Sequence, residues 1–66
     1  MAVYYSNRSA AYFNLEEFEK SLQDANVALT LDSKYLKAYN RKASALFEID
    51  NLQVFYEKLR LFIKIT

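Results

Sequence analysis

Apolar side chains recur at helical spacing along the first half of the chain. A first helix, over about residues 2–14, has small residues between large apolar residues on one face. The large apolar residues are Tyr5, Tyr12 and Leu15. A second, over about residues 17–30, has apolar residues at i, i+4, i+7, i+10 and i+11: Phe18, Leu22, Ala25, Ala28 and Leu29. The pattern therefore predicts two amphipathic helices joined by a short turn.

The chain is similar to itself when it is shifted by 34 residues. Three aligned pairs are identical: Tyr5/Tyr39, Ala11/Ala45 and Phe13/Phe47. Four more are conservative: Arg8/Lys42, Leu15/Ile49, Glu16/Asp50 and Phe18/Leu52. Segments 5–18 and 39–52 are thus two copies of one element. They predict a third helix over about 35–48 and, after a turn at Asp50-Asn51, a fourth over about 51–64.

These elements predict an all-α fold with two tandem helix-turn-helix repeats, that is, four antiparallel helices in a single domain. The first repeat covers about residues 2–33 and the second about 34–66. Asp32 and Ser33 separate them, and their side-chain oxygens suit the cap of the next helix. Glycine and proline are absent from all 66 residues, which argues against a fold rich in β-hairpins.

The last predicted helix is apolar on several sides, unlike the polar cap of a helical array. Its apolar residues are Phe55, Leu59, Leu61, Phe62, Ile63 and Ile65. A chain of this length buries only about 60% of the surface that its unfolded form exposes. Two interpretations stay open: a piece of a longer array, or a chain that pairs with a copy of itself through this helix.

Composition excludes several classes of function. Cysteine and histidine are absent, so disulfides are excluded and we expect no zinc site, no other metal and no cofactor. No nucleophile, phosphate loop or acid-base pair stands out, so we expect no enzyme. A net charge of +1 gives no general attraction to nucleic acid or membranes. The lack of a long apolar segment and of cysteine favours a cytoplasmic protein.

The 34-residue period and the residues within it resemble the tetratricopeptide repeat family. Small residues occupy the family's close-packing positions: Ser9 and Ala43 on the first helix of each repeat, Ser21 and Ala28 on the second helix. Its aromatic or apolar positions hold Tyr12, Leu46, Phe18 and Leu52. The resemblance covers nearly the whole chain and implies a helical solenoid.

The chain also departs from the family pattern. Glu16 and Asp50 replace the usual turn glycine, and Ser33 replaces the proline between repeats. Phe55 and Phe62 fall where the family has alanine, although a connection one residue shorter would bring Val54 and Leu61 there. The packing register of helix 51–64 is therefore the least determined part of the fold.

In such an array the first helix of each repeat lines a concave groove, with its residues spaced by three and four. The groove stripe of the first repeat is Val3, Ser6, Asn7, Ala10 and Asn14, and that of the second is Lys37, Asn40, Arg41, Ser44 and Glu48. Two cations one helical turn apart, Lys37 and Arg41, can reach the same ligand, and arginine binds carboxylates in a bidentate manner.

The motifs Asn7-Arg8-Ser9-Ala10-Ala11-Tyr12 and Lys37-Ala38-Tyr39-Asn40-Arg41 resemble those of chaperone-binding tetratricopeptide domains. This resemblance implies a carboxylate clamp for the acidic C-terminal tail of cytosolic heat-shock chaperones, with Asn7, Lys37 and Arg41 as its residues. The family clamp also takes a lysine and an asparagine from a preceding repeat. Weaker candidates for peptide contact are Ser6, Phe13, Asn40 and Ser44.

Other polar residues are expected to have structural or solvated positions. Arg8 lies beside the groove stripe, and we expect its stem to pack against a neighbouring helix. The acidic residues of the second helix are expected to face solvent: Glu16, Glu17, Glu19 and Asp24. The main hypothesis is a peptide-binding module, and the alternative is an assembly element that self-associates through its last helix.

Overall fold

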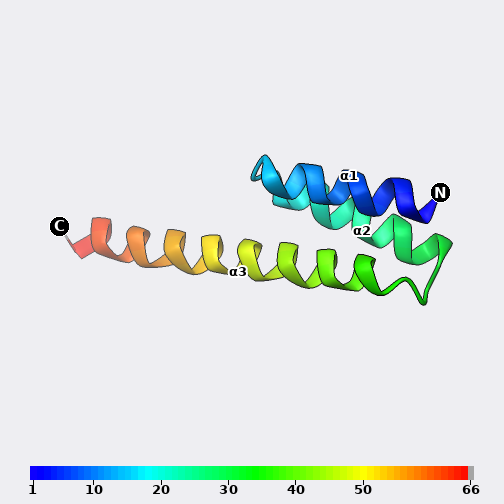
Figure 1. Cartoon of the computed structure of the whole chain (residues 1–66). Coiled ribbons are helices and arrows are strands. Elements are labelled where there is room, and N and C mark those ends of the chain that lie inside the picture. Colours follow the sequence, from blue (N-terminus) through cyan, green and yellow to red (C-terminus); the bar gives the residue numbers. More distant parts are fainter. Residues whose placement is uncertain (66) are drawn as a thin grey trace.

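Three helices make up the computed structural model, in which residues 1–65 are described. They are α1 (Ala2–Asn14), α2 (Phe18–Leu31) and α3 (Leu36–Ile65). Helices α1 and α2 form an antiparallel hairpin, and α3 runs along α2 before continuing well beyond it (Figure 1). The longest extent is 50 Å, because a helix of 30 residues alone measures about 45 Å. The described chain is all-helical, as predicted.

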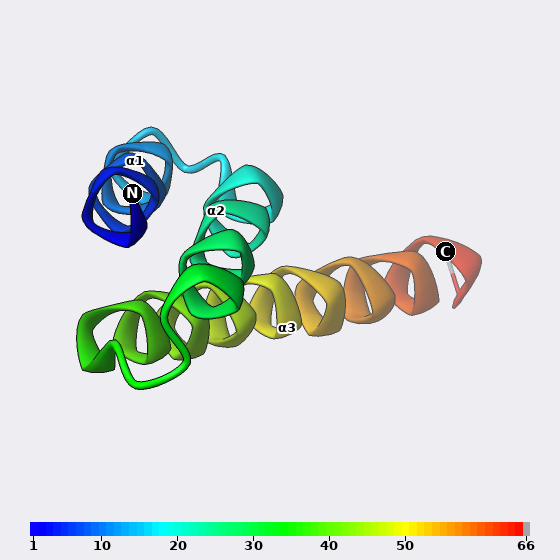
Figure 2. The same cartoon turned by 90° about the vertical axis from the view of Figure 1, so that its right-hand side faces the viewer.

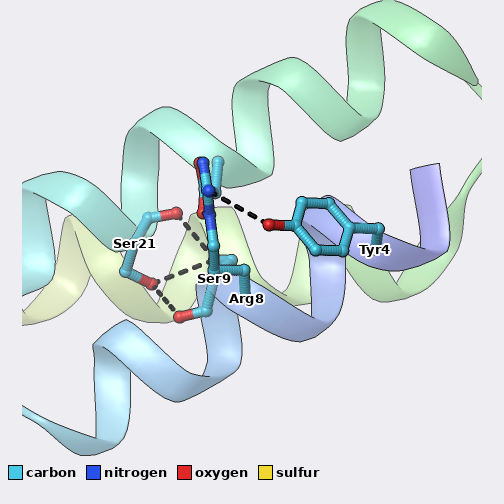
Figure 3. A network of polar contacts seen from close by, with 5 residues as sticks. Tyr4, Arg8, Ser9 and Ser21 are labelled. Atoms are coloured by element: carbon cyan, nitrogen blue, oxygen red, sulfur yellow. Dashed lines mark hydrogen bonds and ion pairs between the residues drawn. The ribbon is translucent and has the colours of Figure 1, made fainter. Parts of the chain in front are cut away.

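The contact between α1 and α2 is built on two buried serines (Figure 3). The Ser9 hydroxyl donates to the carbonyl oxygen of Ser21 at 2.6 Å, and the Ser21 hydroxyl donates to the carbonyl of Ser9 at 2.8 Å. Their two Oγ atoms lie 3.0 Å apart. Such distances bring the two backbones close together, which only small side chains permit. Ser9 and Ser21 were each expected at a close-packing position, and the structure shows that they meet in this contact.

The turn between α1 and α2 is a Schellman motif. The Glu17 N–H donates to the carbonyl of Tyr12 at 2.9 Å, and the Glu16 N–H donates to that of Phe13 at 3.0 Å. Glu16 has φ 62°, the left-handed conformation that glycine adopts most easily. This residue stands where the repeat family has glycine, and the backbone keeps the glycine-like conformation without it.

Helix α2 packs against the first half of α3 (Figure 1), and both helices bury alanines. Ala25 and Ala28 of α2, and Ala38 and Ala45 of α3, are fully buried. The link between the helices is held by the Asp32 carboxylate, which accepts the N–H of Lys34 at 3.1 Å. As a result the first half of α3 is placed firmly on α2.

The predicted fourth helix is wrong in the described structure. Asp50 and Asn51 are helical, so the predicted helices 35–48 and 51–64 are joined into α3 and no turn separates them. The shift of 34 gives a physical reason: Ser9 corresponds to Ala43, but Ser21 corresponds to Phe55. An aromatic ring cannot fit into a contact as close as that of Ser9 with Ser21, so the second hairpin lacks the packing that closes the first.

The outer half of α3 consequently extends past the hairpin (Figures 1 and 2). Every residue from 50 to 64 is exposed, and Ala43, which stands at the small-residue position of the second repeat, is exposed as well. The predicted second repeat ends at Thr66, which lies outside the described residues. In the part of the chain that is described, no helix joins the length and the hydropathy needed to cross a membrane.

Candidate peptide-binding groove

Helix α1 and the first half of α3 lie on the same side of α2 (Figure 2). Between them the structure has a hollow of about 290 Å³, lined by Phe13 at the end of α1 and by four residues of α3: Ala43, Ser44, Phe47 and Glu48. Phe13 also makes an edge-to-face contact with Phe18, with ring centroids 5.2 Å apart, which holds it at this place. The groove side of the fold is therefore concave and partly apolar.

Lys37 and Arg41 lie one turn apart on α3, as the spacing predicts. The Lys37 side chain is exposed and Arg41 is half-buried. The Nε atom of Arg41 is buried and has no hydrogen-bond partner among the described residues. A buried donor without a partner costs free energy unless a water or a ligand satisfies it.

The remaining candidates are placed differently from one another. Asn7 on α1 and Asn40 on α3 are exposed, and Ser44 lines the hollow together with Phe13. Ser6 is only 1% exposed, so it presents almost no surface to a peptide. A peptide lying in the hollow would therefore meet Phe13 and Ser44 but not the hydroxyl of Ser6.

Arg8 is held by α2, next to the Ser9–Ser21 contact (Figure 3). Its Nε donates to Asp24 Oδ2 at 2.6 Å and its Nη2 to Asp24 Oδ1 at 2.9 Å, a bidentate pair. Its Nη1 donates to the Tyr4 hydroxyl at 3.2 Å, and the guanidinium lies within 6 Å of the rings of Tyr4, Tyr5 and Tyr12. The hydrogen bond to Asp24 raises the pKa of Arg8, so this side chain stays charged.

The structure confirms that Arg8 packs on a neighbouring helix but corrects the environment of Asp24. Asp24 is 5% exposed rather than solvated. A signal for this pair is present in the sequence: Ser9 faces Ser21 across the hairpin, so one residue earlier on α1 lies near positions just after Ser21 on α2. Asp24 stands close to three glutamates in the sequence, so its charge alone does not distinguish it from those solvated side chains.

A metal ion would need several ligating side chains close together. Among residues 1–65 there is no group of three or more acidic, histidine or cysteine side chains that could hold a metal ion. The chemistry that this surface offers is the binding of anionic or apolar groups of another molecule.

The tight helical hairpin and the 34-residue repeat in the sequence are typical of α-helical repeat proteins. The chain is 37% identical over 46 residues to the small glutamine-rich tetratricopeptide repeat-containing protein 2 of Saccharomyces cerevisiae, which is 70% of this chain and 13% of that protein. It is 48% identical over 44 residues to human serine/threonine-protein phosphatase 5, 67% of this chain and 9% of the phosphatase. It is 40% identical over 48 residues to human RNA polymerase II-associated protein 3, which is 73% of this chain and 7% of that protein.

These similarities support membership of the tetratricopeptide repeat family and a role in protein–protein interaction. The chain spans no more than 13% of the length of these three relatives. The short match to the phosphatase therefore carries no implication of phosphatase activity. No protein-family model matches the chain, and no solved structure gives a significant match.

Proposed function

We propose that this chain is a cytoplasmic protein-interaction module whose groove between α1 and α3 binds the acidic C-terminal tail of a heat-shock chaperone. The observation that carries the proposal is the pair of cations on α3, Lys37 and Arg41, with a buried Arg41 Nε that has no partner among residues 1–65. The tail of such a chaperone ends in an aspartate, which offers two carboxylates close together.

The chemistry of the contact follows from the side chains. Arg41 can bind one carboxylate in a bidentate manner, and Lys37 adds a second charge one turn away. Asn7, on the neighbouring helix, donates from its amide without adding charge repulsion. After the cost of ordering a flexible peptide, three such contacts support a Kd of about micromolar to millimolar. The similarity to a named tetratricopeptide repeat protein is consistent with this use of the groove.

The proposal is tested by titrating the chain with an acidic pentapeptide that ends in a free carboxylate. Lys37→Ala and Arg41→Ala are each expected to weaken binding about tenfold or more, since each removes a charge-assisted hydrogen bond. Lys58→Ala, which removes an exposed cation from the outer half of α3, is the matched control and leaves the affinity unchanged. Equal affinity for the amidated peptide would exclude a carboxylate clamp.

A second candidate function is assembly of copies of this chain through the outer half of α3. The specific observation is its exposed apolar surface, to which Phe55 and Tyr56 each contribute a side chain that is more than 60% exposed. Monomeric soluble proteins seldom expose so much contiguous apolar surface without a partner. Sedimentation over a range of concentrations tests it, and a monomer at the highest concentration would rule it out.

A further inference from the structure

A stripe of residues with the spacing of a coiled coil runs along α3 and is apolar except at Lys42. Its outer part alternates steps of three and four: Ile49, Leu52, Tyr56, Leu59 and Ile63. The same stripe begins with Ala38 and Ala45, which are fully buried against α2. The contact between α2 and α3 reaches only as far as the α1–α2 turn (Figure 1). The outer part of the stripe therefore continues past the hairpin. The stripe is thus fully buried only at positions in its first half.

The outer stripe forms one wall of an open groove. This groove has a volume of about 950 Å³ and lies between the first turn of α2 and the outer half of α3. Phe18 contributes to its apolar lining from α2, together with the stripe from Ile49 to Ile63. Four of the five stripe residues remain well exposed there, from 43% for Leu52 and Leu59 to 63% for Tyr56 and Ile63, whereas Ile49 is half-buried.

We propose that a second copy of this chain fills the groove, with the outer halves of the two α3 helices packed antiparallel, stripe against stripe. This inference rests on the second candidate function and names its geometry. Leu52 of each copy then lies opposite Ile63 of the other, and Tyr56 opposite Leu59. The two-fold axis passes between residues 57 and 58. Such an interface is isologous and closes at two copies.

The charges at the groove favour this antiparallel arrangement. One end of the groove carries the acidic side chains of the α1–α2 turn, Glu16, Glu17 and Glu19, of which Glu17 also contacts Lys20 at 3.2 Å. The other end carries Arg60 and Lys64. In an antiparallel pair the basic end of one α3 lies beside the acidic turn of the other copy, whereas a parallel pair would place like charges together.

The surface available is sufficient for a weak dimer. A tyrosine or phenylalanine can bury about 150–250 Å² in full, and the stripe residues and the flanking Phe55 expose about half of theirs. With the methylene stems of the charged rim, the two copies bury on the order of 1,000 Å² in total, the lower limit for a specific interface. We therefore expect a Kd in the micromolar range.

The first test measures mass by sedimentation equilibrium of the full chain from low to several hundred micromolar. The unmodified chain is expected to shift from monomer to dimer. Leu59→Glu puts a charge into the stripe and is expected to leave a monomer at all concentrations. Leu61→Glu is the matched control, because Leu61 is exposed on the same helix but outside the stripe, and it keeps the dimer. Circular dichroism verifies that both variants retain α3.

The second test uses the absence of native cysteine to read the orientation. A mixture of Leu52→Cys and Ile63→Cys chains is expected to form a disulfide-linked heterodimer under mild oxidation. Leu52→Cys alone is not, because residues 52 of the two copies lie about 16 Å apart in the antiparallel pair, too far for a disulfide.

The outcomes separate the inference from the function on which it rests. A chain that stays monomeric overturns both. A dimer in which Leu52→Cys crosslinks to itself, or in which Leu59→Glu has no more effect than Leu61→Glu, overturns the antiparallel stripe and leaves self-association standing. A dimer with the 52–63 crosslink and the Leu59 dependence supports both.

Discussion

Replacing Glu16 by glycine tests whether the turn between α1 and α2 stores backbone strain. Glu16 has φ 62°, and its N–H and that of Glu17 complete the Schellman motif at the end of α1. Its side chain is exposed, so its removal gives up no packing. Compared with Glu16→Ala, which removes the same carboxylate, the substitution therefore isolates the backbone preference of this one position.

The expected change in the free energy of unfolding follows from two opposing contributions. A left-handed backbone costs a residue with a Cβ atom about 1–2 kcal/mol. Glycine loses more conformational freedom on folding, which offsets about 0.5–1 kcal/mol of that gain. We expect Glu16→Gly to raise the free energy of unfolding by about 0.5–1 kcal/mol. For a domain of this size, each kcal/mol raises the Tm by about 4–8 °C.

The assay is thermal unfolding followed by circular dichroism, at a protein concentration low enough that all variants are monomeric. Glu16→Ala is the matched control, because it removes the carboxylate and keeps the Cβ atom that causes the strain. It should show none of the gain. A Tm for Glu16→Gly at or below that of Glu16→Ala would refute the reasoning.

Three further predictions concern the hairpin and the long helix. Ser21→Phe should abolish the cooperative thermal transition, since a ring cannot enter the close contact with α1. In thermal unfolding, Arg8→Met and Asp24→Leu should each lower the Tm, and the double variant should lose less than the two single losses together, because the charges are paired. The double variant Asp50→Gly/Phe55→Ala should let the chain turn after α3's first half, and small-angle scattering should then give a longest dimension well below 50 Å. An unchanged dimension would show that Phe55 and the missing glycine are not what keeps α3 straight.

The pattern of apolar and small residues was enough to predict the first repeat, because the helix spacing and the close-packing residues agree there. The apolar spacing predicted α1 and α2 within a residue of their observed ends, and Ser9 and Ser21, expected at close-packing positions, lie in the contact between them. Lys37 and Arg41 were likewise expected one turn apart on the groove side of α3. That spacing is a property of the helix and needs no tertiary information.

The second repeat shows where periodicity stops being informative. The shift of 34 aligns Asp50 with Glu16 and so predicts a second turn, yet a turn forms only when the helices on either side of it can pack together. Phe55 in place of a small residue removes that packing, and without it the helix propagates through Asp50 and Asn51. Similarity of sequence at the turn was not sufficient, because the close contact that drives the turn lies five residues further on.

The sequence by itself determined the all-helical class, the first hairpin and the placement of Lys37 and Arg41 one turn apart on one helix, because these depend on spacing along one helix or between neighbours. Only the tertiary structure decided that Asp24 is buried against Arg8, that Ser6 is covered, and that α3 is a single helix. Each of these depends on how closely two distant segments can approach, and such distances are set by the volumes of facing side chains rather than by the period of either segment.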